Sequence, residues 1–306
     1  MPKIGNQLLD AVVYLYGSES NANDGVRAGG SGFVLGVWSQ PQNLMYLYVV
    51  TNRHVVQKGC SVVRMTSGSN EVVVKVVPEE DWVCPRGTND DLAIWLFGTQ
   101  HLTNDINFSA VSFDRLIMKE SVSEYSVGDD CFMLGRFVTH DGRQRNLPTA
   151  RFGNISMLPT EPVEVGRDEF ADLFMVETRS QAGYSGSPVF LYREKTAVSI
   201  PVRPSINYTT GVRNIEVSAS ERVDIKLLGV NLGQFPRLAT IVQVNDSEEV
   251  IQGQHPELPK DARVELGSSM IGVVPAWKLL DLVNREDVRS VRQESRPSYL
   301  IETPGA

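Results

Sequence analysis

The chain has 306 residues, of which 42% are hydrophobic and 22% charged. Both fractions are typical of globular proteins, so the chain can bury a core, and global disorder is excluded. The formal net charge is −8 at pH 7, which favours solubility and argues against a partner that is bound through its phosphates. We therefore expect no nucleic-acid partner.

The N-terminus, MPKIGNQLLDAVVYLYG, contains one lysine and a short apolar run that polar residues interrupt. It fits neither a signal peptide nor a membrane-spanning helix, so no membrane partner is expected. Cys60, Cys84 and Cys131 are odd in number and lack the spacing of metal ligands. This pattern favours free thiols in a cytoplasmic protein, and we expect neither a metal nor another cofactor.

Short runs rich in Val, Tyr, Phe and Leu recur along the chain, most of them bounded by Gly, Pro, Asn or Asp, as β-strands commonly are. They are AVVYLYG, SGFVLGVW, LMYLYVVTN, CSVVRMTS, EVVVKVVP, DLAIWLFG, DCFMLGRF, ADLFMVET, SPVFLY, KLLGVNLG and ATIVQVN. Because few long segments have a helical period, these runs predict an all-β barrel architecture.

One segment near the C-terminus has the period of a helix. In VPAWKLLDLVNRED, Trp277, Leu280 and Val283 follow Pro275 at helical spacing. A shorter helical turn is expected from His54 to Lys58. Two polar stretches, 193–226 and 245–266, are expected to be long loops, and residues 289–306 are expected to form a C-terminal tail.

The segment QAGYSGSPVF, residues 181–190, concentrates Gly, Ser and Pro just before a predicted strand. These residue types are common in tight turns, so a surface turn is one interpretation. The alternative is a nucleophile loop, in which a serine hydroxyl faces the substrate and backbone amides bind an oxyanion. The segment by itself does not decide between the two.

A serine nucleophile needs a base within hydrogen-bonding distance, usually a histidine that a carboxylate holds in the right tautomer. Of the four histidines, only His54 closes a strongly apolar strand, YLYVVTNRHVV, where a rigid scaffold meets a loop. His101 follows a strand end, and His140 and His255 lie in polar, turn-like contexts. We expect these three to be solvated.

The best context for the carboxylate is TNDDLAIWLFG, in which Asp91 opens an alternating strand. Asp90 points to the opposite side of the pleat, so only one of the two can face an imidazole. The alternative is that both aspartates cap the strand in a surface turn.

Together, YVVTNRHVV, NDDLAIWLF and AGYSGSPVF resemble the three catalytic blocks of trypsin-like serine proteases, in the same order. The likeness is closest to the HtrA-type, disulfide-free branch and extends from about residue 10 to 285. It implies two six-stranded antiparallel β-barrels with a C-terminal helix. Because only about twenty residues follow this helix, we expect no PDZ domain. The likeness also implies one protease domain over residues 1–288, with the first barrel at about 8–115 and the second at about 120–288.

The resemblance also implies roles for individual residues. Ser185 would attack the scissile carbonyl, His54 would take and later deliver the proton, and Asp91 would steady the imidazolium. The backbone N–H groups of Gly183 and Ser185 would form the oxyanion hole. Tyr184 stands where digestive-type zymogens place an aspartate that pairs with a newly cut N-terminus. Activation by N-terminal cleavage is therefore not expected. We expect control by expression, loop ordering, self-assembly or an activating partner instead.

By the same resemblance, Leu232, Gly233 and Gln234 would pair with the extended substrate backbone. Arg179 stands at the floor of the pocket for the side chain that precedes the cleaved bond, where it would pair with an acidic or polar group. The alternative is that Arg179 faces solvent or bonds Glu177. We predict that cleavage of a peptide library favours Asp, Glu or a polar residue at this position. A strong preference for Lys or Arg would contradict the assignment.

The leading functional hypothesis is a cytoplasmic serine endopeptidase that cleaves a protein or peptide substrate through an acyl-enzyme. A second hypothesis is a catalytically silent trypsin-like fold that acts as a protein-binding module. A third is an esterase that uses the same groups on small esters, which the strand for backbone pairing disfavours.

Overall fold

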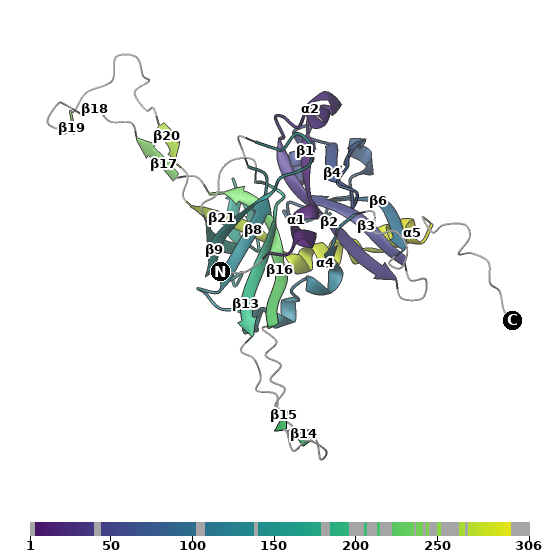
Figure 1. The fold of residues 1–306 in the computed structure, drawn as a ribbon. Helices are drawn as coiled ribbons and strands as arrows, with labels where there is room; N and C mark the ends of the chain where they lie inside the picture. Colours follow the sequence, from purple (N-terminus) through teal and green to yellow (C-terminus); the bar gives the residue numbers. More distant parts are fainter. Residues whose placement is uncertain are drawn as a thin grey trace.

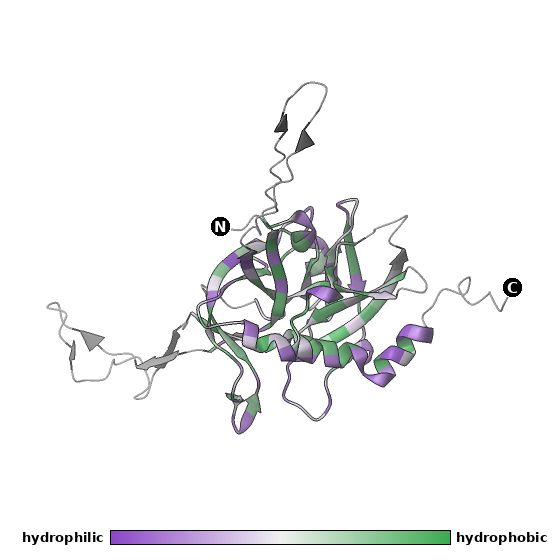
Figure 2. Cartoon of the chain, turned by 90° about the horizontal axis from the view of Figure 1, so that it is seen from below, coloured by the Kyte–Doolittle hydropathy of each residue, from purple (hydrophilic) through white to green (hydrophobic). Residues whose placement is uncertain are grey.

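The computed structural model describes residues 4–39, 44–101, 108–137, 140–178, 184–195, 205–206, 213–214, 222–235, 237–240, 243–244, 250–251, 263–266 and 269–294. Most of its strands belong to two β-structures, a seven-stranded sheet and a closed barrel, which lie side by side and are called the first and second β-body below (Figure 1). The predicted all-β fold is confirmed. Figure 2 shows that hydrophobic residues are concentrated in the strands of both bodies.

The first β-body is a seven-stranded sheet with the order β5-β4-β1-β2-β3-β6, to which β7 adds by parallel pairing with β2. Its strands are β1 (Val12–Tyr16), β2 (Gly30–Ser39), β3 (Leu44–Thr51), β4 (Val62–Thr66), β5 (Val72–Val76), β6 (Ala93–His101) and β7 (Val111–Ser112). The outer edge of β6 pairs at Ile94 with Val83, and not with β5. The strand order does not close on itself, so this body is a half-barrel, whereas the sequence predicts a closed barrel.

The second β-body is a closed barrel of six antiparallel strands, as predicted, with the order β12-β21-β16-β13-β8-β9. Its strands are β8 (Asp130–Gly135), β9 (Thr149–Met157), β12 (Phe174–Thr178), β13 (Pro188–Lys195), β16 (Arg222–Gln234) and β21 (Met270–Pro275). A two-stranded hairpin, β10 (Val163–Gly166) with β11 (Glu169–Ala171), precedes β12.

The two stretches predicted to be loops contain strands in their described parts. The first stretch contains β14 (Ser205–Ile206), which pairs with β15 (Arg213–Asn214). The second contains β19 (Val250–Ile251) and β20 (Arg263–Leu266), which pair respectively with β18 (Gln243–Val244) and β17 (Arg237–Thr240) just before it. In addition, β13 and β16 pair as far as Lys195 opposite Arg222, so the barrel strands extend into the first stretch.

Helices are short and lie at the ends of strands or at the C-terminus. They are α1 (Asn6–Asp10), α2 (Glu19–Asp24), α3 (Arg53–Gln57), α4 (Ala276–Asn284), α5 (Glu286–Glu294) and the 3-10 turns η2 (Glu79–Asp81), η3 (Phe113–Arg115) and η4 (Lys119–Glu124). Among the described residues, no helix has the length and apolar character needed to cross a bilayer.

The C-terminal helices differ from the prediction, because a second helix follows the predicted one. The first ends where Arg285 adopts an extended backbone (ψ 139°), and α5 then covers residues 286–294, so the first part of the predicted tail is helical. Helix α4 packs Trp277 edge-on against Phe174 of the barrel, with ring centroids 5.6 Å apart. Helix α5 reaches the half-barrel, where Arg292 lies 5.8 Å from the ring centre of Tyr46. This tertiary contact stabilises a helix that is too polar to be predicted from apolar spacing.

All three cysteines are free. Burial raises the pKa of Cys131 to about 12, with Asp130 and Asp129 adding to the shift, and burial also raises the pKa values of Cys60 and Cys84. A raised pKa lowers the thiolate fraction at neutral pH, so these thiols are poor nucleophiles.

Candidate active site

The register of two neighbouring strands brings His54 and Asp91 together. β3 and β6 pair antiparallel with Thr51 opposite Ala93, so the residues that follow β3 lie beside those that precede β6. His54, in the first turn of α3, places Nδ1 2.5 Å from Oδ2 of Asp91. The backbone N–H of His54 donates to Oδ1 of the same carboxylate at 2.9 Å. One carboxylate therefore orients both the ring and the backbone of residue 54.

This contact assigns the tautomer of the imidazole. Because Nδ1 lies against a carboxylate, the ring proton belongs on Nδ1, and Nε2 is left as an acceptor. The side chain of His54 is 31% exposed and that of Asp91 is 15% exposed. The imidazole of His54 can therefore be reached from outside, while the carboxylate that holds it is more shielded.

Asp90 faces a different partner from Asp91, the aspartate that the sequence analysis assigns to the imidazole. Its carboxylate is buried and lies 3.5 Å from Nζ of Lys278 on α4, which also pairs with Asp172 at 3.2 Å. Burial alone would lower the pKa of Lys278, but the two carboxylates raise it above its ordinary value. Asp90 is therefore part of a structural ion pair, and Asp91 alone contacts the imidazole.

The loop that carries Asp91 is held from both sides. Arg53 donates through Nη2 to the carbonyl oxygens of Pro85 and Asp90, each at 3.0 Å, and Asn52 donates to the carbonyl of Asp91 at 2.7 Å. From the C-terminal helices, Arg285 donates to the carbonyl of Cys84 at 2.8 Å. Side chains adjacent to His54 thus bind the same loop that supplies its acid.

Ser185 lies in the turn before β13 and is tied to the half-barrel through its backbone. The N–H of Ser31 donates to the carbonyl of Ser185 at 2.9 Å, and the hydroxyl of Thr51 donates to the carbonyl of Ser31 at 2.8 Å. The side-chain Oγ of Ser185 donates to the carbonyl of Leu232 at 3.3 Å. Within the described part of the chain, it makes no hydrogen bond to His54. The hydroxyl therefore points to β16 and not to the imidazole.

Asn231, which the sequence reasoning missed, connects the serine turn to β16. Its side-chain Nδ2 donates to the carbonyl of Tyr184 at 2.8 Å, and its carbonyl accepts from the N–H of Gly186 at 2.9 Å. Its Oδ1 accepts from the N–H of Gly233 at 3.1 Å. The available signal was a polar amide inside the apolar run KLLGVNLG, because a buried amide must find partners.

Leu232, Gly233 and Gln234 line a cleft of about 480 Å³ together with His54 and Asp91. The N–H of Gly233 is occupied by Asn231, so this donor is not free for a substrate strand in the structure. The other lining residues are Arg53, Gln57, Asn89, Val165, Glu169 and Phe235. The hairpin β10–β11 thus forms a wall of the cleft, which the sequence did not indicate.

Arg179 and Gly183 lie outside the residues that the structure describes. The predicted pocket floor and the first predicted oxyanion donor therefore stay predictions.

Comparison with protein families decides the membership of the chain. The model of the trypsin-like peptidase domain matches residues 30–200, which is more than half of the chain. The chain belongs to the trypsin-like peptidase family. The matched range contains His54, Asp91 and Ser185.

Several solved protease structures resemble this trypsin-like peptidase. Deg5 aligns with a TM-score of 0.41 and 18% identity over 74% of this chain and 81% of its own. The HtrA-type protease AlgW with a decapeptide has a TM-score of 0.44 and 15% identity over 88% of this chain and 53% of its own, so the peptidase spans about half of AlgW. The active form of the Rv3671c protease from M. tuberculosis has a TM-score of 0.40 and 17% identity over 91% and 81%. Comparison with curated proteins finds no match.

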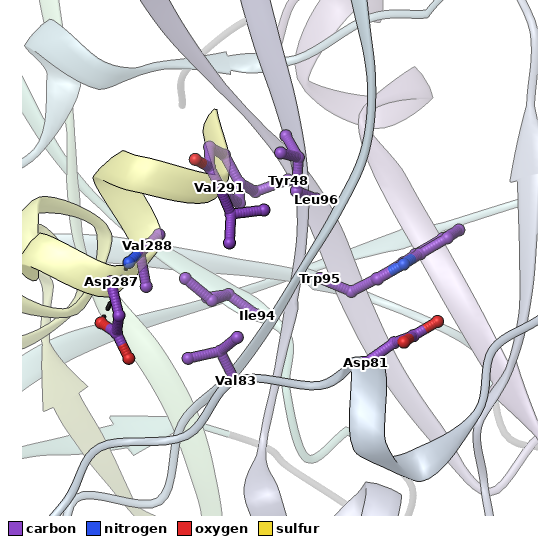
Figure 3. A pocket seen from close by; sticks show the side chains of 9 residues that line it. All are labelled: Tyr48, Asp81, Val83, Ile94, Trp95, Leu96, Asp287, Val288 and Val291. Atoms are coloured by element: carbon purple, nitrogen blue, oxygen red, sulfur yellow. Dashed lines mark hydrogen bonds between the residues drawn. The ribbon is translucent and has the colours of Figure 1, made fainter. Parts of the chain in front are cut away.

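A second hollow of this peptidase, of about 330 Å³, lies between α5 and β6 (Figure 3). Its lining residues are Tyr48, Asp81, Val83, Ile94, Trp95, Leu96, Asp287, Val288 and Val291. Hydrogen bonds from Arg285 lower the pKa of Asp287, which also pairs with Arg86. Because these walls are mostly apolar and pair no nucleophile with a base, this hollow is not a candidate catalytic centre. In the described part of the chain, no group of His, Cys, Asp and Glu side chains is arranged as a metal site.

Gly186 is a position of the peptidase where a side chain is not tolerated. Its φ is +86°, and a Cβ there would collide with the carbonyl of Ser31 and the hydroxyl of Thr51. We predict that Gly186→Ala lowers the free energy of unfolding by about 2 kcal/mol or more, measured by urea denaturation. Gly87→Ala is the matched control, because Gly87 also has a positive φ (69°) but nothing within 4 Å of its Cβ position. An equal loss in both variants would contradict the predicted collision.

Proposed function

We propose that this trypsin-like peptidase is a serine endopeptidase with Ser185 as nucleophile, His54 as base and Asp91 as orienting acid. The observation that carries the proposal is the 2.5 Å contact between His54 and Asp91 in a cleft whose wall, Leu232, also binds the hydroxyl of Ser185. Acyl transfer needs a base held in the right tautomer and a serine hydroxyl that can turn toward it.

The chemistry follows from these groups. Ser185 Oγ attacks the scissile carbonyl as its proton passes to Nε2 of His54, and the resulting oxyanion accepts hydrogen bonds from backbone N–H groups, for which we propose Gly183 and Ser185. The imidazolium then protonates the leaving amine, which departs and leaves an acyl-enzyme. Water, deprotonated by His54, releases the acid and regenerates the hydroxyl of Ser185.

The proposed substrate is an extended peptide segment of a protein, bound beside Leu232, Gly233 and Gln234. The open cleft and the last residues of β16, which extend past the end of its pairing with β13 at Val230, support this substrate class. We further propose a cytoplasmic location, supported by the three free thiols, and control by an activating partner or self-assembly.

The test is labelling by a fluorophosphonate probe, comparing the wild-type chain with Ser185→Ala. Labelling that the substitution abolishes supports the endopeptidase, and release of peptide fragments from a denatured protein substrate distinguishes it from an esterase. Labelling that persists in Ser185→Ala would show that another residue is the nucleophile.

The second candidate is a silent protein-binding module, which one observation favours. The hydroxyl of Ser185 donates to Leu232 and not to His54, so the triad is not assembled in this conformation. If the module hypothesis holds, the chain binds extended peptides but neither labels nor hydrolyses. Hydrogen bonds at active sites are often long or misaligned without substrate, so we rank this candidate second.

A further inference from the structure

Tyr184, the residue before Ser185, is held at both its side chain and its backbone. The side chain is 1% exposed, and its phenol oxygen accepts a hydrogen bond from Nε of Arg151 at 2.9 Å. The guanidinium carbon of Arg151 lies 4.9 Å from the centre of the Tyr184 ring. At the other end, the carbonyl of Tyr184 accepts from Asn231 at 2.8 Å and from the N–H of Ser187 at 3.1 Å.

The wall of the second barrel is shaped to admit this ring. Arg151 lies on β9, opposite Met133 of β8, and Thr149 on the same strand places its hydroxyl 3.4 Å from the phenol oxygen. Gly135 of β8 leaves the necessary space, because a Cβ there would collide with the ring of Tyr184 and the hydroxyl of Ser187. The phenol of Tyr184 therefore occupies a preformed space in the barrel wall, lined by these residues.

The contact between the Arg151 guanidinium and the Tyr184 phenol combines two favourable interactions. A hydrogen bond from a charged donor is about twice as strong as a neutral one, and a guanidinium near an aromatic ring adds an electrostatic attraction. Because Tyr184 precedes Ser185 directly, fixing its ring and its carbonyl fixes the backbone from which the serine side chain projects. The turn that carries Ser185 is therefore ordered by a side chain of the barrel itself, Arg151.

We propose that Arg151 is a positioning residue, which acts through Tyr184 to hold Ser185 in place. The proposal rests on the proposed function only in giving Ser185 the role of nucleophile. Its structural part, that Arg151 orders the turn 184–187, is independent of catalysis.

The first test compares Arg151→Leu, Arg151→Lys and Tyr184→Phe in fluorophosphonate labelling and in peptide hydrolysis. We expect Arg151→Leu and Tyr184→Phe each to lower kcat about tenfold to a hundredfold with KM changed less than about twofold, because serine placement and not substrate binding is affected. The double variant should lose little more than either single one. Arg151→Lys should recover part of the rate, because its ammonium can still donate to the phenol.

Arg145→Leu is the matched control, because Arg145 is an exposed arginine on the β8–β9 connection that bonds Asn70. It should label and hydrolyse at the wild-type rate. A KM that rises while kcat is unchanged would overturn the positioning role, and so would wild-type rates in Arg151→Leu and Tyr184→Phe.

The second test is amide hydrogen exchange, which needs no activity. In Arg151→Leu we expect the amides of Gly186 and Ser187 to exchange about tenfold faster or more, while those of β16 and β21 are unchanged. If the wild-type chain does not label but this local exchange rises, the proposed function fails and the positioning role stands. Unchanged exchange, or faster exchange over the whole barrel, would overturn the proposal.

Discussion

Replacing Ser185 with alanine is expected to lower turnover on the order of 10⁶-fold, and His54→Ala is expected to do the same. Each substitution removes one of two groups that act as a unit, because the hydroxyl is unreactive without a base and the base has no nucleophile to activate. The double variant should therefore lose little more than either single one. The measurement is kcat on a fluorogenic peptide.

Stability should separate a lost function from a lost fold. Ser185 lies at a cleft and not in the core, so we expect the free energy of unfolding of Ser185→Ala to change by less than about 0.5 kcal/mol in urea denaturation. Ser187→Ala is the control, because the Ser187 hydroxyl is buried and unpaired among the residues that the structure describes. It should retain activity. Turnover within tenfold of wild type in Ser185→Ala would contradict the assigned nucleophile.

Asp91→Asn is expected to lower turnover by about 10⁴-fold with the fold intact. The carboxamide can still accept from the backbone N–H of His54, so the local geometry should survive. If its NH2 group faces the ring, however, Nδ1 must accept, and the ring proton moves to Nε2. An imidazole protonated at Nε2 cannot take the proton of Ser185. The readout is kcat together with a circular dichroism spectrum.

Asp90→Asn is the matched control for this substitution. Asp90 lies next in the chain but faces Lys278, so its loss should change turnover less than about tenfold. A larger loss of turnover in Asp90→Asn than in Asp91→Asn would show that Asp90, and not Asp91, is the orienting acid.

Much of the fold follows from local chemistry. Alternating apolar residues in runs such as YLYVVTN predict the strands of both bodies, because one face of each strand must be buried. The same reasoning placed His54 at the end of an apolar strand and Asp91 at the start of another, and the structure brings these two into contact. Whether the first sheet closes was not predictable, because the runs predict each strand but not which strands pair at the ends of the sheet; β6 pairs at Ile94 with Val83 and not with β5, and the sheet stays open.

The sequence by itself determined the strands, the family resemblance and the segments that meet at the cleft. The tertiary structure alone decided that Asp90 pairs with Lys278, and that Asn231 binds Tyr184. It also decided that α5 continues into the predicted tail. The physical reason is the distance along the chain over which each interaction acts. Burial of apolar side chains sets a pattern along a few neighbouring residues, whereas each of these contacts joins side chains that are distant in the chain and are oriented only once the two bodies have packed.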